Sequence, residues 1–158
     1  MDEKQRSKQS AGNNAKEVRA DYGWSMPISS RWADCDPYGH VNNAMYYNWI
    51  DTAVTTLAIE RGILRAPGQT TIGLCVSSAC QFLRPIGFPA TVDACVRLGR
   101  IGDKSLRYEV ALFAAGEDEP SAVADFTHVY VDRNTRTSVT LTEKQKAAMR
   151  DLLRADAA

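Results

Sequence analysis

The hydrophobic residues of this chain follow different periods in different regions. After residue 43, apolar side chains recur at i, i+4, i+7, i+8 and i+11, which is the spacing of one helix face. This stripe consists of Tyr46, Ile50, Ala53, Val54 and Leu57. Asn42 or Asn43 can cap such a helix, and Gly62 suits its end. The pattern predicts one long helix that is largely covered by the rest of the protein.

After Gly62 the pattern changes to that of β-strands. Residues 91–101 and 105–115 alternate between apolar and polar side chains, and Gly102-Asp103 between them predicts a tight hairpin. The complete set of expected strands is 24–32, 70–84, 91–101, 105–115 and 122–132. Pro27 places the first strand near an edge or a bend. Because hairpin-linked strands form antiparallel sheets, we expect an α+β fold with a curved antiparallel sheet against the long helix.

The two ends of the chain differ from this core. Residues 1–21 are polar and nearly free of large apolar side chains, which predicts a disordered tail before a folded domain at residues 22–158. Thr140 and Glu143 have capping-box spacing, so a short helix is expected at residues 141–153.

Composition and charge exclude several classes of protein. The 158 residues fit one domain, and a formal net charge of zero gives no basis for nucleic acid as the main partner. No apolar run approaches the roughly 20 residues of a membrane span, and the N-terminal residues lack the apolar stretch of a signal peptide. These features favour a soluble cytoplasmic protein.

The four cysteines do not have the spacing of a redox motif or a zinc site. They are Cys35, Cys75, Cys80 and Cys95. The last three lie in apolar stretches, which are typical of buried reduced thiols.

The densest group of reactive residues lies in the loop that precedes the expected helix. A calcium-loop pattern fits Asp34, Asp36 and Gly39, but two essential oxygen ligands are missing, which excludes it. A transition-metal site made of Asp34, Asp36 and His40 would be poor in nitrogen ligands. Nucleophilic attack by Cys35 is disfavoured, because the flanking carboxylates oppose its thiolate form.

A carboxylate acting beside a helix N-terminus is the fourth alternative for this loop. The first turn of a helix presents free N–H groups and a partial positive charge, which stabilise a developing oxyanion. A nearby carboxylate can attack an acyl carbon or activate water. Thioesters suit such a site, because a thiol with a pKa of about 8.5 leaves readily as thiolate. An Asp-Pro-x-Gly loop with an Asn cap is, however, also common turn chemistry.

The loop and the helix start resemble a known family. Residues 34–43, DCDPYGHVNN, are similar to the D-x-D-x-x-G-H-V-N-N loop of acyl-CoA thioesterases. The wider stretch 31–51 resembles the 4-hydroxybenzoyl-CoA thioesterase family. Shorter similarities are FLRP at residues 82–85, KS at 104–105 and VYVD at 129–132. The resemblance runs from about residue 24 to residue 154.

This resemblance implies roles for individual residues. Asp36 would be the catalytic carboxylate, and the N–H group of Asn43 would polarise the thioester carbonyl. His40 would shape the pocket or orient a water molecule. The expected substrate-binding residues are Tyr38, Gly39, Tyr46, Lys104 and Ser105. The last two match a region that contacts the nucleotide of coenzyme A in the family.

The family also implies a fold, an assembly and a reaction. Its hotdog fold wraps a curved antiparallel sheet around one long central helix, and its members are dimers or tetramers with active sites at subunit interfaces. We expect hydrolysis of a small-molecule acyl-CoA or aryl-CoA thioester to free acid and CoA, with Asp36 as nucleophile or general base. No metal or redox cofactor is expected, since coenzyme A is part of the substrate. The alternatives are a hydratase of acyl thioesters and a non-catalytic acyl-CoA-binding module.

Overall fold

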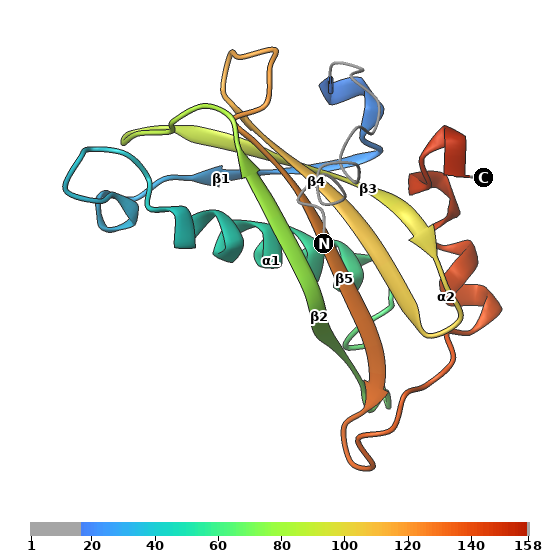
Figure 1. Cartoon of the computed structure of the whole chain (residues 1–158). Helices are drawn as coiled ribbons and strands as arrows, with labels where there is room; N and C mark the ends of the chain where they lie inside the picture. Colours follow the sequence, from blue (N-terminus) through green and yellow to red (C-terminus); the bar gives the residue numbers. More distant parts are fainter. Residues whose placement is uncertain (1–16, 158) are drawn as a thin grey trace, which may run out of the picture.

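Five strands form one antiparallel sheet in the computed structural model, which describes residues 17–157 (Figure 1). They are β1 (Trp24–Ser29), β2 (Thr71–Phe82), β3 (Thr91–Ile101), β4 (Ser105–Ala114) and β5 (Ala122–Asp132). Their order across the sheet is β1-β3-β4-β5-β2, and all neighbours are antiparallel. The predicted antiparallel sheet is therefore confirmed, and β1 and β2 are its edge strands.

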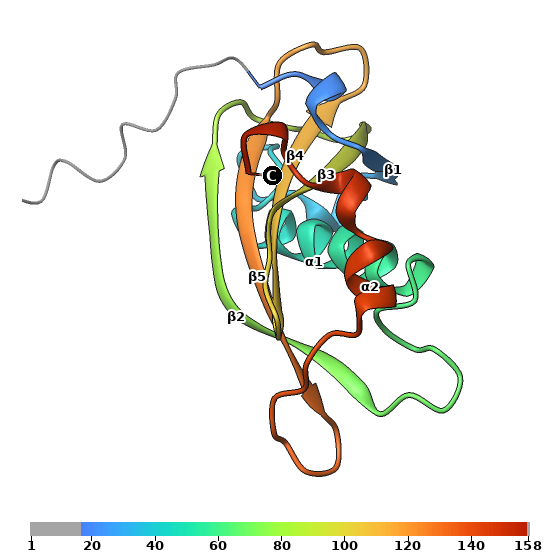
Figure 2. The ribbon, with the colours of Figure 1, turned by 90° about the vertical axis from the view of Figure 1, so that its right-hand side faces the viewer.

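The helix α1 (Asn43–Glu60) packs on one face of the curved sheet (Figure 2). Its buried side chains are Tyr46, Trp49, Ile50, Ala53, Val54, Leu57 and Ala58. They share one core with inward-facing residues of the strands, among them Val96 and Leu98 of β3. Asn48, Asp51 and Thr52 on the other side are exposed. The sheet thus covers one face of this 18-residue helix and leaves the opposite face open.

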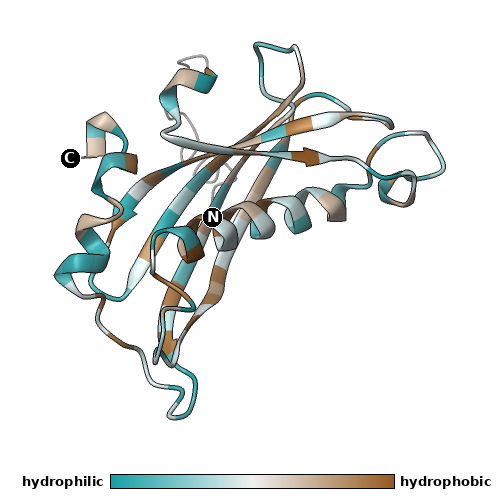
Figure 3. Cartoon of the chain, turned by 180° about the vertical axis from the view of Figure 1, so that it is seen from behind, coloured by the Kyte–Doolittle hydropathy of each residue, from teal (hydrophilic) through white to brown (hydrophobic). Residues whose placement is uncertain are grey.

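Apolar and polar positions are mixed along the strands (Figure 3), as the alternating pattern predicts. No helix within residues 17–157 is long and apolar enough to cross a membrane.

Two boundaries differ from the sequence expectation. The first strand ends at Ser29 rather than at residue 32, because the N–H group of Ser30 donates to the carbonyl of Ala90 at 2.8 Å and the chain then turns into a short 3-10 helix. At the C-terminus the cap is Thr142, whose hydroxyl accepts from the N–H group of Gln145 at 3.2 Å. Thr140 was therefore the wrong cap.

The C-terminal helix is also shorter than expected. Helix α2 (Glu143–Ala147) has five residues and is followed by a 3-10 turn at Arg150–Leu152. The N–H group of Leu141 bonds the carbonyl of Asp103 at 2.7 Å, so the chain is tied to the β3–β4 hairpin just before the helix starts. Met149 and Leu152 then pack into the core shared with α1.

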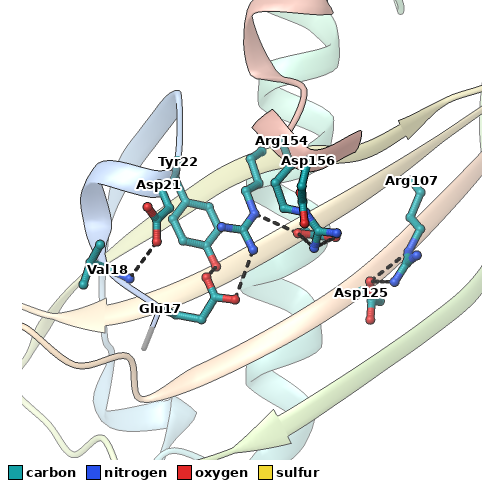
Figure 4. A network of polar contacts seen from close by, with 10 residues as sticks. Glu17, Val18, Asp21, Tyr22, Arg107, Asp125, Arg154 and Asp156 are labelled. Carbon is teal, nitrogen blue, oxygen red and sulfur yellow. Dashed lines mark hydrogen bonds and ion pairs between the residues drawn. The ribbon is translucent and has the colours of Figure 1, made fainter. Parts of the chain in front are cut away.

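Both terminal segments cover part of the sheet face that lies away from α1 (Figure 4). Glu17 accepts hydrogen bonds from the hydroxyl of Tyr22 and the guanidinium of Arg97, each at 3.0 Å. Glu109 accepts from Arg97 at 2.7 Å and from Arg154 at 3.1 Å. These ion pairs allow Arg97 and Glu109 to be buried on an outer face.

The last residues of the expected tail, 17–21, lie in this region. Residues 1–16 lie outside the described part of the chain. Arg19, near the end of the expected tail, donates to the carboxylate of Asp93 at 2.5 Å and to the carbonyls of Ala114 and Glu117 at 3.0 Å. Residues 17–21 therefore contact the folded domain.

The cysteines differ in burial more than the sequence suggested. Cys95 is buried and Cys80 is half-buried, but Cys75 is exposed. The prediction of burial was wrong for Cys75, because β2 is an edge strand with no neighbour on its outer side. Burial raises the pKa of the Cys80 thiol to about 11 and also raises that of Cys95.

Candidate active site

The loop between β1 and α1 is held at both ends by the connection between β2 and β3. Near its start, the Ser30 hydroxyl accepts from the N–H group of Ala90 at 2.8 Å. Near its end, the N–H group of Val41 donates to the carbonyl of Ile86 at 2.7 Å. These bonds fix the loop to the main sheet, so the side chains between them have defined positions.

The side chain of Asp34 stabilises the first half of this loop. Its carboxylate is buried and accepts from the Arg31 N–H group at 2.7 Å and from the Arg31 guanidinium at 2.7 and 3.0 Å. These hydrogen bonds with Arg31 hold the pKa of Asp34 below its ordinary value. The Asp34 carbonyl accepts from the N–H group of Asn42 at 2.8 Å, which joins the loop to the helix start.

Asp36 lies in the tight turn that follows. Its Oδ1 atom accepts from the N–H groups of Tyr38 at 2.9 Å and His40 at 3.3 Å. The turn closes with a bond from the Gly39 N–H group to the Asp36 carbonyl at 3.1 Å, and Gly39 has a φ of +82°, which favours glycine. Within residues 17–157, Oδ2 of Asp36 has no hydrogen-bond partner. The turn thus holds one of the two carboxylate oxygens of Asp36 in place.

The N-terminus of α1 offers an unpaired donor. Asn42 is its cap, with Oδ1 accepting from the Ala44 N–H group at 2.9 Å, while the Met45 N–H group bonds the Asn42 carbonyl at 2.9 Å. The N–H group of Asn43 has no acceptor among the residues that the structure describes. This donor lies at the positive end of an 18-residue helix, where it can stabilise an anion.

A cleft of about 290 Å³ opens beside this helix end. Its lining consists of His40, Val41, Asn43, Tyr46, Phe82, Leu83, Arg84 and Pro85. The rings of Tyr46 and Phe82 meet edge to face with centroids 5.1 Å apart, and they form an aromatic wall. Burial raises the pKa of Tyr46 above its ordinary value.

The structure brings together some of the predicted site residues. His40, Asn43 and Tyr46 line one cleft, and Asp36 is bonded to the backbone of His40. Asp36 does not itself line the cleft within one chain. Tyr38 is 85% exposed and is not part of the cleft lining either.

The β3–β4 hairpin, which carries Lys104 and Ser105, lies at the end of β3 away from the loop (Figure 1). Both residues follow Ile101, the last residue of β3, whereas the loop contacts Ala90, which immediately precedes β3. The eleven residues of β3 separate the two places by about 35 Å along the strand. Lys104 Nζ donates to the Ser138 hydroxyl at 3.1 Å. One chain therefore does not combine these two residues with Asn43.

Several cleft residues were not expected from the sequence as site residues. Phe82, Leu83, Arg84 and Pro85 come from the end of β2 and the following turn. Their only signal was the similarity of the FLRP stretch to the thioesterases. The donor set Asp34, Asp36 and His40 does not form a metal-binding group, and no other such group of three or more His, Cys, Asp or Glu residues occurs within residues 17–157.

Comparisons with known proteins show the family to which the chain belongs. A family profile described as "Thioesterase-like superfamily" matches residues 30–155. The PA5185 protein from Pseudomonas aeruginosa has 42% sequence identity and a TM-score of 0.82, with 87% of this chain and 96% of that chain covered. No curated protein sequence matches the chain.

More distant structures share the fold alone. A 1,4-dihydroxy-2-naphthoyl-CoA thioesterase from Synechocystis has 15% identity and a TM-score of 0.71, covering 82% of this chain and 96% of that one. A DHNA-CoA thioesterase from Staphylococcus aureus has 17% identity and a TM-score of 0.67, covering 74% and 79%. The family match spans most of the folded domain. It includes the loop, the cleft residues and the strands β2, β3, β4 and β5. The chain belongs to the thioesterase-like superfamily.

Proposed function

We propose that this chain hydrolyses an acyl-CoA or aryl-CoA thioester to the free acid and CoA. The observation that carries the proposal is the unpaired N–H group of Asn43 at the rim of an aromatic-walled cleft, next to the turn that holds Asp36. The loop sequence further favours the 4-hydroxybenzoyl-CoA thioesterase branch of the superfamily. Two distant relatives are named as CoA thioesterases, which supports coenzyme A as the thiol part of the substrate.

The reaction can follow two routes with the same groups. In one, Asp36 Oδ2 attacks the carbonyl carbon, the oxyanion is held by the Asn43 N–H group, and the C–S bond breaks to release thiolate. Water then hydrolyses the mixed anhydride. In the other, Asp36 takes a proton from a water molecule as the water oxygen attacks the same carbon, and the C–S bond then breaks to release thiolate and leave the free acid. His40, which lines the cleft, would orient that water.

A thiol-release assay over short, long and aromatic acyl-CoAs tests the proposal. Asp36→Asn should reduce kcat by at least about 100-fold, since loss of a general base or nucleophile has effects of roughly 10²–10⁴. The matched control is Asp125→Asn, because Asp125 is half-exposed and pairs with Arg107 on the other sheet face. Near-normal turnover by Asp36→Asn would refute the role of Asp36.

The same assay separates the alternatives. Binding of acyl-CoA without thiol release by the wild type would indicate a non-catalytic module. Loss of double-bond absorbance from an enoyl-CoA, without thiol, would indicate a hydratase.

We also propose that the chain works as a homodimer or homotetramer. The edge strand β2 is exposed along most of its 12 residues, and its apolar Leu74 and Val76 are 37% and 59% exposed. A long edge strand that exposes apolar side chains invites pairing with another chain, and pairing with a strand of a second copy would cover it. A second chain would also be needed for Lys104 and Ser105 to reach a substrate held at Asn43. Sedimentation analysis should give at least twice the chain mass, and Val76→Lys should shift it to the monomer.

A further inference from the structure

We propose that Arg84 recognises an anionic group of the substrate at the cleft beside Asn43. The inference rests on the proposed function, because it assigns a binding role within that site. Among the described residues that line the cleft, Arg84 is the one with a permanent positive charge. The walls around it, from Tyr46, Phe82 and Pro85, are mainly apolar.

The backbone at Arg84 is fixed. The N–H groups of Leu83 and Arg84 both donate to the carbonyl of Ser121, at 2.8 and 3.0 Å, and the ring of Pro85 restricts the backbone of Arg84, the residue before it. The Arg84 side chain is 48% exposed, so its guanidinium group lies within reach of solvent and of a ligand. A cation on a rigid backbone at the side of a cleft is suited to orienting a charged ligand.

In this structure, Arg84 pairs with carboxylates of the turn between β4 and β5. Glu117 lies 3.9 Å from its guanidinium group, and Glu119 pairs with it directly. The side chains of these glutamates are 57% and 36% exposed. Exposed ion pairs contribute little to stability, so a substrate anion can replace them at small cost. The glutamates would then compete with the substrate for Arg84.

The chemistry of the ligand follows from the guanidinium group. Its planar fork binds carboxylate or phosphate oxygens through two parallel hydrogen bonds. A thioester substrate can supply such oxygens from two sources: the phosphates of coenzyme A, or a carboxylate at the far end of the acyl group. The shared feature is an anionic oxygen group that Arg84 binds while the thioester carbonyl lies at Asn43.

Three thioesters separate these sources. They are hexanoyl-CoA, the hexanoyl thioester of N-acetylcysteamine, which is uncharged, and the adipoyl thioester of N-acetylcysteamine, which carries a carboxylate. Arg84→Gln should raise KM by at least about fivefold for the thioester whose anionic group Arg84 binds. The KM of the uncharged thioester should not change. A rise for hexanoyl-CoA identifies the phosphates, and a rise for the adipoyl thioester identifies the acyl carboxylate.

Control variants make the result specific. Arg107→Gln removes an equally exposed arginine from a carboxylate pair on the other sheet face and should leave all three KM values unchanged. Arg84→Lys keeps the charge and should restore part of the loss. Glu117→Gln with Glu119→Gln should lower KM for the anionic substrate, because the competing carboxylates are gone. Equal KM values for wild type and Arg84→Gln, or an equal rise for all three thioesters, would overturn the role of Arg84.

Binding measurements keep this test separate from the proposed function. If the wild type releases thiol from none of the thioesters, hydrolysis fails as the function. The Kd of hexanoyl-CoA and of the adipoyl thioester, measured by calorimetry, then decides on Arg84. If Arg84→Gln raises the Kd of one of them by at least about fivefold, anion recognition is supported. Unchanged Kd values for both ligands refute it.

Discussion

The guanidinium group of Arg31 and the buried carboxylate of Asp34 lie 2.7 Å apart. The same carboxylate accepts the Arg31 N–H group, and the Asp34 carbonyl accepts the N–H group of the helix cap Asn42. Asp34 therefore connects the start of the loop to the start of α1. The position of the Asn43 donor relative to Asp36 depends on this connection.

Asp34→Asn should lower the free energy of unfolding in a pH-dependent way. The hydrogen bonds from Arg31 lower the pKa of Asp34, so the carboxylate contributes stability above its unfolded pKa of about 3.9 and loses it as the pH falls through the lower folded value. Urea unfolding should show a difference between wild type and variant at pH 7 that shrinks below about pH 4. An equal difference at pH 7 and pH 3 would contradict this account.

Asn42→Ala should weaken both the helix start and the site. Removal of the cap that holds the Ala44 N–H group should reduce the free energy of unfolding by about 1 kcal/mol, and kcat should fall because the first turn frays at Asn43. Asn42→Asp, which keeps a capping oxygen, serves as the control. Thermal unfolding and thiol release on both variants check the prediction; an alanine variant as stable as the aspartate variant would speak against it.

The hydroxyl groups of Tyr108 and Tyr130 should show strong coupling in stability. They lie 2.7 Å apart and both side chains are fully buried. Tyr130→Phe leaves the Tyr108 hydroxyl without this partner, which should cost about 1–3 kcal/mol, whereas the double Phe variant should cost less than the two single changes together. A double-mutant cycle by urea unfolding measures this, and simple additivity would disprove the coupling.

His128 should make the fold sensitive to mild acid. It is buried, its Nδ1 has no hydrogen-bond partner among residues 17–157, and burial lowers its pKa, although Asp51 opposes this. Below the unfolded pKa of about 6.5 the unfolded chain binds a proton that the folded chain resists, so stability should fall from pH 7 towards the folded pKa. His128→Phe should flatten this dependence. An unchanged slope in that variant would assign the effect to other groups.

Strand bounds can be predicted from the sequence where the pattern involves only neighbouring residues. The bounds of β3 and β5 were predicted without error, because alternation and the Gly102-Asp103 hairpin are properties of neighbouring residues. The prediction failed at the C-terminal helix, where Thr140 and Thr142 are both reasonable caps. A distant contact, from Leu141 to the carbonyl of Asp103, decides between them.

The residues of the candidate site also differ in whether a local sequence pattern predicts them. The turn and the helix cap at residues 34–43 follow from local residue preferences, and the resemblance of this motif to the thioesterases points to Asp36, His40 and Asn43. Phe82 and Arg84 reach the same cleft from a strand that begins after the helix has ended, and no period or spacing in the sequence relates them to it.

The antiparallel strands, the amphipathic helix and the turn at Asp36 can be predicted from the chain alone, since each follows from the conformational preferences of adjacent residues. Long-range contacts instead set which residues face the Asn43 donor, which strand edge stays open, and the distance of Lys104 from the cleft. These depend on the strand order β1-β3-β4-β5-β2, in which β2 ends up beside β5 and at the edge of the sheet. Strand order is a matter of contacts between distant residues, whose free energy comes from burial and not from local periodicity.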